Sequence, residues 1–334
     1  MTALIDGYDA VFFDLDGVIY LGQSAVGGAA ATMAALDARG VRIMYLTNNA
    51  ARSNQTVVDH LLRLGVPARP ETVLTSAQVA AAALARELPA GSKVLVAGSE
   101  SLAGLIAGAG LAPVYSADDE PVAVVQGYEP QLRWPMLDEV CLAVGRGARW
   151  YATNDDASRP VERGLVPGMG GMIAAIRLAL GVSPVIFGKP FRPMLEEAGR
   201  RTGAVRPILV GDRVDTDIAG AGNAGLDSLL VFSGAHGKRE LVAAGEGERP
   251  TYIGADVSAL LAPARKAEYA DGVSRCGGVE ARASDGVVAL SGVPGDIEGQ
   301  LDALWAAATL VWRLADAGDT VDSQAALSAL DLVR

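Results

Sequence analysis

The sequence predicts an α/β protein whose centre is a doubly wound, Rossmann-like parallel sheet. Two observations lead to this fold class. Short apolar runs bounded by Gly, Asp or Asn alternate with alanine-rich stretches of helical length, and the pattern changes after residue 255. Half of the 334 residues are hydrophobic, so the chain has enough apolar surface to fold, and its length suits about two domains.

The apolar runs are short and almost continuous, as expected of parallel strands buried on both faces. The predicted strands cover residues 8–15, 41–47, 94–97, 122–126, 150–153, 185–187, 208–210 and 229–232. Apolar residues three and four positions apart predict intervening helices over residues 29–39, 56–64, 77–87 and 171–180. In such sheets ligands bind at the carboxyl ends of the strands, so functional residues are expected there.

The sequence pattern of residues 256–334 predicts a small α+β appendage, in which no catalytic motif is recognised. Asp285-Gly286 lies between two alternating runs, which is a strong hairpin signal. Apolar positions between residues 297 and 315 share one helix face. Asp296 is placed to cap that helix and Gly318 to end it, and a second helix is expected near residues 323–332.

Composition excludes several classes of protein. Twenty-eight basic and 39 acidic residues give a net charge of −11, which disfavours nucleic acid and anionic membranes as partners. Cys141 and Cys276 are far apart and the chain has two histidines, so neither a disulfide framework nor a zinc site is supported. Residues 1–9 lack a basic stretch, and the apolar segment 303–312 is about half a membrane span. A cytoplasmic protein without membrane insertion is expected.

The strongest motif lies at the end of the first predicted strand. The apolar run ends at Asp14 and Asp16, separated by one residue, and Gly17 follows. Two carboxylates this close repel each other unless a cation lies between them or one is protonated. A surface turn would also explain this motif if it stood alone.

Polar residues also follow three other predicted strands. One strand ends in Thr47-Asn48-Asn49, another leads into Lys189, and a third into Asp212 with Asp217 five residues later. Each group alone is explained by a helix cap, a loop lysine or a turn. Four polar groups at four strand ends, in the order Asp, Thr, Lys, Asp, favour a single active site.

These motifs resemble the haloacid dehalogenase superfamily of phosphohydrolases. D-L-D-G-V-I-Y, L-T-N-N, G-K-P and G-D-R-V-D-T-D-I are similar to the subgroup that includes p-nitrophenyl, pyridoxal, phosphoglycolate, glycerol-3-phosphate and nucleotide monophosphate phosphatases. The resemblance implies a hydrolase core at residues 1–69 and 185–255 and an inserted α/β cap at residues 70–184 that sets specificity. Residues 256–334 resemble an acetyltransferase fragment and are expected to be non-catalytic.

The resemblance also implies the chemistry of each residue. Asp14 is expected to attack phosphorus and form an aspartyl phosphate, with Asp16 as general acid and then general base. Mg²⁺ is expected on the Asp14 carboxylate, the Asp16 carbonyl and Asp212. Asp217 is expected behind these ligands, holding waters or Lys189.

Phosphoryl binding is assigned to the remaining motif residues. Thr47 and Lys189 are expected to act in catalysis by binding phosphoryl oxygens. The residues expected to bind substrate are Asp16, Thr47, Asn48, Asn49, Lys189, Arg213, Val214, Asp215 and Thr216. Asp215 is expected to lie outside the metal ligands.

The expected activity is Mg²⁺-dependent hydrolysis of a small phosphorylated metabolite, with glycerol 3-phosphate as the leading substrate. Phosphoglycolate, pyridoxal phosphate and nucleotide monophosphates stay open. A partner-binding protein on a phosphatase scaffold and a bifunctional phosphatase and acetyltransferase are the alternatives from other classes. Self-association into a homo-oligomer also stays open.

Overall fold

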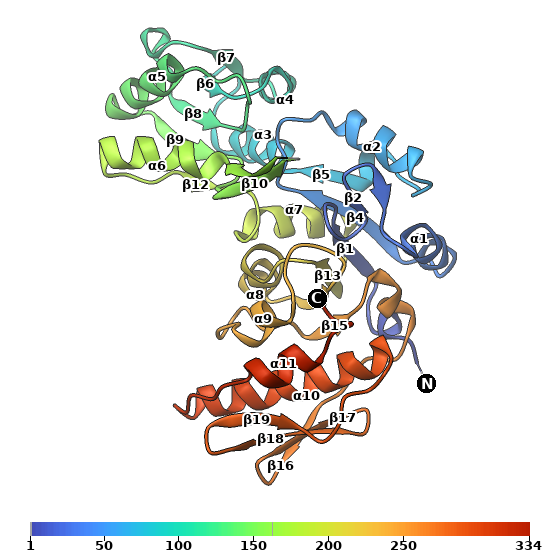
Figure 1. Ribbon diagram of the computed structural model, residues 1–334. Helices are drawn as coiled ribbons and strands as arrows, with labels where there is room; N and C mark the ends of the chain where they lie inside the picture. The colour runs from blue at the N-terminus through green and yellow to red at the C-terminus, as the bar shows by residue number, and fades with distance from the viewer. Residues whose placement is uncertain (1, 162) are drawn as a thin grey trace. The chain divides into compact units, whose positions relative to one another are not determined.

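A computed structural model describes residues 2–161 and 163–334, and Figure 1 shows its elements in chain order. Two compact units share the chain. Unit 1 contains residues 1–44, 64–67 and 202–334, and unit 2 contains residues 45–63 and 68–201.

Unit 1 is built on parallel strands that are almost fully buried. The main sheet has the order β15-β14-β13-β1-β4-β5, of which β15, β14, β13, β1 and the first half of β4 belong to unit 1. Apolar residues occupy both faces of its central strands, and the first four residues of β1 are 0% exposed. This two-sided burial is typical of parallel strands and explains the continuous apolar runs. The strand bounds are β1 Ala10–Asp14, β4 Arg42–Thr47, β5 Val73–Thr75, β13 Pro207–Gly211, β14 Asp227–Val231 and β15 Tyr252–Gly254.

Short helices and one small hairpin connect these strands. The helix α1 ends where Gly40 takes a positive φ of 71°, and α8 ends at Gly225 with a φ of 69°, a conformation that glycine adopts without steric cost. The connecting elements of unit 1 are η1 Leu4–Gly7, β2 Tyr20–Leu21, β3 Ser24–Ala25, α1 Ala29–Ala38, the π-helical turn η4 Val214–Ile218, α8 Ala219–Ala224, α9 Lys238–Val242 and η5 Val257–Leu261.

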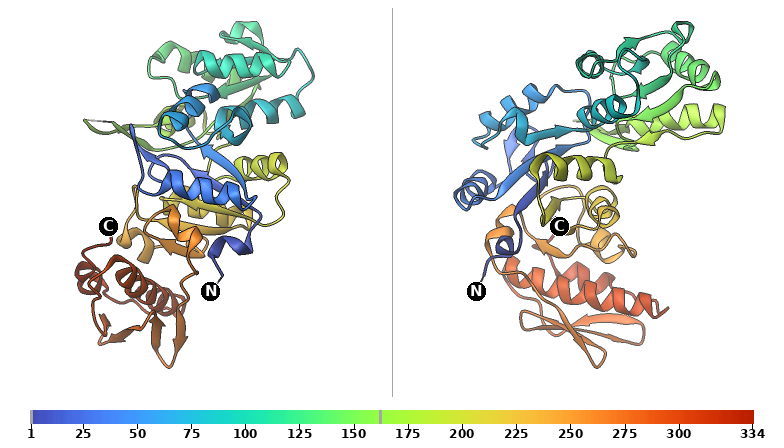
Figure 2. Two further views of the ribbon diagram at one scale, coloured as in Figure 1. Left: turned by 90° about the vertical axis from the view of Figure 1, so that its right-hand side faces the viewer. Right: turned by 180° about the vertical axis from the view of Figure 1, so that it is seen from behind.

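The C-terminal part of unit 1 is an antiparallel sheet of order β16-β17-β18-β19 with α10 packed on it. Figures 1 and 2 show the sheet as a layer along one side of α10. Asp285 and Gly286 have positive φ angles of 50° and 76°, as a two-residue hairpin turn requires. The bounds are β16 Glu268–Ala270, β17 Val273–Cys276, β18 Val279–Ser284, β19 Val287–Leu290, α10 Ile297–Asp316 and α11 Gln324–Ala329.

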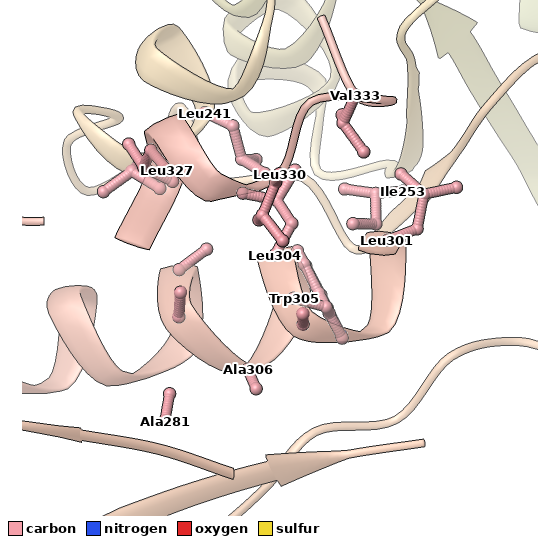
Figure 3. Packing of buried hydrophobic residues seen from close by; sticks show 14 of the residues in the cluster. Leu241, Ile253, Ala281, Leu301, Leu304, Trp305, Ala306, Leu327, Leu330 and Val333 are labelled. Atoms are coloured by element: carbon pink, nitrogen blue, oxygen red, sulfur yellow. The ribbon is translucent and has the colours of Figure 1, made fainter. Parts of the chain in front are cut away.

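One hydrophobic cluster joins this C-terminal part to the edge of the main sheet. Figure 3 shows Leu301, Leu304 and Leu330 beside residues of the sheet and of α9. Ile253 of β15 and Leu241 of α9 belong to the same cluster. This C-terminal part, termed here the C-terminal segment (residues 268–334), therefore shares its hydrophobic core with the main sheet.

Unit 2 contains a second parallel sheet of order β12-β9-β8-β6-β7. Thr75 begins α3 with a reciprocal cap, in which its Oγ1 accepts from the Gln78 N–H at 3.2 Å and its own N–H donates to Gln78 Oε1 at 3.0 Å. The bounds are α2 Asn54–Arg63, η2 Pro70–Thr72, α3 Ser76–Glu87, β6 Lys93–Ala97, α4 Glu100–Gly108, β7 Ala112–Val114, η3 Ala117–Asp119, β8 Ala123–Gln126, α5 Trp134–Gly145, β9 Arg149–Ala152, β10 Ser158–Val161, β11 Gly164–Pro167, α6 Met169–Leu180, β12 Val185–Ile186 and α7 Arg192–Thr202.

The structure confirms the predicted fold class. All eight predicted strands are present, with ends shifted by one or two residues. The Asp285-Gly286 hairpin and the long helix capped by Asp296 are also confirmed, since Asp296 Oδ1 accepts from the Gly299 N–H at 2.9 Å. The division at residues 69/70, 184/185 and 255/256 stays a prediction. Within residues 2–161 and 163–334, no helix has the length and apolarity needed to span a membrane.

Candidate active site

The carboxyl end of β1 carries the D-x-D-G motif. Asp14 is the last residue of β1 and is half-buried, whereas Asp16 is exposed. The chain turns at once, because Leu15 O accepts from the Ile19 N–H at 2.9 Å. Gly17 has a φ of 90° in this turn, and Tyr20 Oη lies 3.5 Å from Asp16 Oδ2. Glycine is therefore the residue that best adopts the backbone conformation needed at position 17 of the motif.

The carboxyl end of β13 supplies two further aspartates. Asp212 follows β13 directly and is 2% exposed, and Asp217 lies in η4 and is 1% exposed. Asp212 Oδ2 accepts from the Ala235 N–H at 2.5 Å. Asp217 Oδ2 accepts from the Arg213 N–H at 3.1 Å. Backbone amides thus fix the orientation of both buried carboxylates.

Asp14, Asp212 and Asp217 form one cluster of carboxylates. Each offers an oxygen, and these oxygens lie within 4.8 Å of one another. Carboxylates at this spacing repel unless a cation or proton compensates, and hard oxygen ligands suit Mg²⁺. The donor set therefore fits a divalent cation. Asp217 belongs to this cluster, and its placement behind the metal ligands stays a prediction.

Glycines leave the space that these carboxylates occupy. A Cβ on Gly17 would lie 2.2 Å from Asp212 Oδ2, and one on Gly234 would lie 2.0 Å from the same atom. A Cβ on Gly211 would lie 2.1 Å from Asp217 Cβ. No side chain fits at these distances, so the three glycines shape the cluster.

Residues 213–216 follow Asp212 and include the predicted substrate contacts. The Arg213 guanidinium forms two hydrogen bonds to Asp215, at 3.0 and 2.7 Å. Burial opposes the charged form of Arg213, but Asp215, with Asp217 and Asp212 nearby, raises its pKa. Val214 is 5% exposed and packs in the cluster shared with the C-terminal segment, while Thr216 is half-buried. Their role toward substrate stays a prediction.

Unit 2 holds a separate group of predicted residues around Asn48. Its Oδ1 accepts from the Lys189 N–H at 2.8 Å, and its Nδ2 donates to Lys189 O at 2.9 Å. Lys189 is 2% exposed and Thr47 is 5% exposed. A Cβ on Gly188 would lie 2.6 Å from Asn48 Oδ1, so the glycine of G-K-P permits this close approach.

Two residues beyond the predicted set complete the group around Asn48. Asp156 Oδ1 accepts from Asn48 Nδ2 at 3.0 Å, and Asn154 Nδ2 donates to Asn48 O at 2.8 Å. Asn49 Oδ1 accepts from the Ala51 N–H at 3.0 Å, and the predicted contact of Asn49 with substrate stays a prediction. The N-D-D run at residues 154–156, which follows β9, was the available sequence signal for these partners.

Sequence reasoning also missed residues 233–237, termed here the 233–237 loop. Ser233 Oγ donates to Gly17 O at 2.7 Å. The His236 N–H donates to Asp212 O at 3.1 Å, and His236 Nδ1 accepts from the Val214 N–H at 2.9 Å. The loop follows β14 at a strand end and reads Ser-Gly-Ala-His-Gly, a turn signal that could have located it.

Comparison with known proteins agrees with these motifs. Residues 11–112 match the model of the haloacid dehalogenase-like hydrolase family, and residues 186–260 match a second model described as HAD-hydrolase-like. A D-glycerol 3-phosphate phosphatase from Mycobacterium tuberculosis is 43% identical over 260 residues, which are 78% of this chain and 73% of that protein. The chain belongs to the haloacid dehalogenase-like hydrolases.

Other haloacid dehalogenase-like hydrolases are similar over different shares of the chain. A 5'-nucleotidase from Bacillus subtilis is 34% identical over 73% of this chain and 94% of its own. A crystal structure of a glycerol phosphate phosphatase from Mycobacterium tuberculosis in complex with magnesium has a TM-score of 0.85 and 37% identity, covering 99% of this chain and 98% of its own. A p-nitrophenyl phosphatase from Archaeoglobus fulgidus has a TM-score of 0.71 and 27% identity over 76% of this chain and 98% of its own.

Proposed function

We propose that the protein is a Mg²⁺-dependent phosphomonoesterase that hydrolyses glycerol 3-phosphate to glycerol and phosphate through an aspartyl phosphate. The observation that carries this proposal is the carboxylate cluster at the ends of β1 and β13. Asp14 is its half-buried member, while Asp212 and Asp217 are buried. Such a cluster offers both a metal site and a nucleophile that a substrate can reach.

The cation would be held by the Asp14 carboxylate, the Asp16 carbonyl and Asp212, with Asp217 close behind these ligands. When bound, it neutralises negative charge so that an anionic carboxylate can approach an anionic phosphate. The Ala235 N–H orients Asp212, and the Arg213 N–H orients Asp217. Because these two hydrogen bonds already orient the carboxylates, less conformational freedom is lost when an ion binds.

The chemistry takes place in two displacements. Asp14 Oδ attacks phosphorus while the bond from phosphorus to the ester oxygen breaks, and the Asp16 carboxyl donates its proton to the leaving alkoxide. Water then attacks phosphorus, Asp16 accepts its proton, and the Asp14–phosphorus bond breaks. Asp14 is regenerated as a carboxylate, and Asp16 is again protonated.

Thr47, the Asn48 backbone and Lys189 are proposed to bind the non-bridging phosphoryl oxygens, as the order of motifs in the family implies. Arg213, Val214, Asp215, Thr216 and Asn49 are proposed to contribute to substrate binding. These assignments rest on the motifs. Substitution of Lys189 by Met tests whether the Lys189 ammonium binds a phosphoryl oxygen. Loss of the ammonium is expected to reduce phosphate release far more than it changes the melting temperature.

Glycerol 3-phosphate is proposed because the two Mycobacterium tuberculosis comparisons name a glycerol phosphate phosphatase. The structural comparison spans 99% of this chain and so includes the C-terminal segment. Other relatives are named as a 5'-nucleotidase and as an acid sugar phosphatase. We take nucleotide monophosphates as the second candidate substrate class. A cytoplasmic location belongs to the proposal, since the expected substrate is a phosphorylated metabolite.

The test is phosphate release from a panel of phosphomonoesters, with Mg²⁺ or with chelator. The panel contains glycerol 3-phosphate, phosphoglycolate, pyridoxal phosphate and a nucleotide monophosphate. Wild type is expected to release phosphate only with Mg²⁺ and fastest from glycerol 3-phosphate. Asp14→Asn is expected to abolish release, whereas Asp37→Asn, at an exposed position of α1, leaves it unchanged.

The other outcomes are equally informative. A different preferred ester would retain the mechanism and replace the substrate. Substantial activity in Asp14→Asn would show that the nucleophile is wrong. No release from any ester would overturn the enzyme assignment in favour of a partner-binding protein, and binding of acetyl-coenzyme A would support the bifunctional alternative.

A further inference from the structure

The segment formed by residues 330–334, termed here the latch segment, runs beside the 233–237 loop. The Lys238 N–H donates to Arg334 O at 2.7 Å, and Lys238 Nζ donates to Val333 O at 2.7 Å and to Leu330 O. The Arg334 guanidinium donates to Gly234 O. Hydrogen bonds thus join the latch segment to both the 233–237 loop and the start of α9.

The latch segment is anchored on its other side by the long helix α10. Leu330 and Val333 are 0% and 1% exposed. They belong to the same hydrophobic cluster as Ile253 of β15 and Leu304 of α10, and Figure 3 labels all four. Gln300 of α10 accepts from the Leu332 N–H at 2.8 Å through its Oε1. Its Nε2 donates to Asp331 Oδ1, also at 2.8 Å. The segment is therefore fixed to a rigid helix.

The 233–237 loop faces the carboxylate cluster. Its Ala235 N–H donates to Asp212 Oδ2, and Ser233 Oγ donates to Gly17 O, next to Asp16. A Cβ on Gly237 would lie 2.6 Å from Arg334 O, and one on Gly234 would lie 2.0 Å from Asp212 Oδ2. The loop is thus enclosed between Asp212 on one side and the latch segment on the other.

We propose that the latch segment positions the 233–237 loop for metal binding, with Arg334 as a positioning residue that acts on Asp212 through Gly234 and Ala235. A backbone amide orients a carboxylate only as well as its own loop is fixed, and surface loops are otherwise mobile. The latch segment supplies that fixation from the C-terminal part of unit 1. For the identity of the ion, the inference rests on the proposed function.

The first test is hydrogen exchange of the full chain without metal, measured by mass spectrometry on peptides that cover residues 233–237. Arg334→Met removes the guanidinium donor and keeps the aliphatic stem. The 233–237 loop is expected to exchange at least threefold faster in this variant, with recovery in Arg334→Lys. Arg282→Met, on the exposed face of the C-terminal sheet, is expected to exchange like wild type.

The second test is the dissociation constant for Mg²⁺, measured by calorimetry on the same variants. Arg334→Met is expected to bind Mg²⁺ about tenfold more weakly, within the range known for partners of metal ligands, while the melting temperature stays close to that of wild type. A purely structural role would lower the melting temperature and leave the Mg²⁺ affinity unchanged.

Three results separate the inference from the proposed function. If the 233–237 loop exchanges hydrogen at the wild-type rate in Arg334→Met, the latch segment does not fix the loop. If the loop exchanges faster but Mg²⁺ affinity is unchanged, the latch segment fixes the loop without affecting the metal site. If wild type fails to bind Mg²⁺, the proposed function fails, and the exchange experiment alone then decides whether the latch segment fixes the loop.

Discussion

The Asn48 side chain bonds to both backbone polar groups of Lys189. Its Oδ1 accepts from the Lys189 N–H at 2.8 Å, and its Nδ2 donates to Lys189 O at 2.9 Å. The second Nδ2 proton is directed to Asp156 Oδ1 at 3.0 Å. Both donors and the acceptor of the amide are therefore used within unit 2, so any contact of Asn48 with a phosphate would come from its backbone.

Asn48→Asp tests this arrangement. A carboxylate at this position still accepts from the Lys189 N–H but cannot donate to Lys189 O, and it places negative charge beside Asp156, so the Lys189 backbone loses one of its two hydrogen bonds to this side chain. We expect kcat for phosphate release to fall by about 10- to 100-fold, because small displacements of a positioning group have effects of this size. Steady-state kinetics measure the loss. The control Gln324→Glu, an amide-to-acid change at an exposed position, should match wild type, and equal activity in both variants would refute the prediction.

Gly211→Ala tests the space around Asp217. Its new Cβ would lie 2.1 Å from Asp217 Cβ and 2.6 Å from Oδ2, so Asp217 must move. We expect Mg²⁺ affinity, measured by calorimetry, to fall by about 10- to 100-fold. Gly104→Ala, at an exposed site inside α4 with open space around it, should instead stabilise the fold by about 0.5–1 kcal/mol. Wild-type Mg²⁺ affinity in Gly211→Ala would contradict the prediction.

Glu197 predicts a pH dependence of stability. Its side chain is 2% exposed and accepts from Arg200 at 2.7 Å and Arg201 at 2.9 Å. Burial alone would raise the pKa of Glu197, but the two arginines hold it at about 2. Because the folded pKa lies below the ordinary value of 4.5, this stabilisation is present above about pH 4.5 and is lost as the pH falls toward 2.

Urea unfolding at several pH values checks this prediction. The free energy of unfolding of wild type should decrease between pH 4.5 and pH 2, and Glu197→Gln should decrease less steeply over the same window. Both proteins must be compared at equal ionic strength, since salt screens the exposed arginines. Parallel curves for the two proteins would be inconsistent with a depressed pKa at Glu197.

The two cysteines should differ in reactivity. Burial, with the Asp302 carboxylate 3.7 Å away, raises the pKa of Cys276 to about 12. At pH 8 its thiol is therefore almost entirely protonated, and the thiolate is the reactive form. Cys141 is half-buried. A thiol reagent should therefore modify Cys141 in the native protein and Cys276 only after unfolding, and equal native rates would contradict this.

The features predicted from sequence are those that depend on local pattern. The run at residues 10–13 is apolar because the strand is buried on both faces, and Asp14 ends it because the strand ends there. The hairpin turn at Asp285-Gly286 needs two residues with positive φ angles, and an Asp-Gly dipeptide is a local sequence signal for such a turn. The placement of Asp14 and Asp212 at one edge follows the same logic, since parallel strands bring their carboxyl ends together. Asp217 lies in the same cluster, whereas the ligand set expected from the motifs has the Asp16 carbonyl in that place.

The features that were missed depend on distant partners. β15 has three residues, too few for a periodic signal. The role of Asp156 depends on Asn48, which is 108 residues away, and no local pattern encodes that contact. The C-terminal segment was recognised as a hairpin and helices, but its shared core with β14 and β15 requires packing that sequence spacing does not contain.

The bond between Arg334 and Gly234 joins residues that are 100 positions apart. During translation Gly234 leaves the ribosome roughly 5 to 20 s before Arg334, at a rate of about 5–20 residues per second. Over that interval the nascent chain contains Asp14, Asp212 and Asp217 but has no latch segment. If Arg334 positions the 233–237 loop as proposed, the order of synthesis makes the orientation of Asp212 a later event than the appearance of the three aspartates.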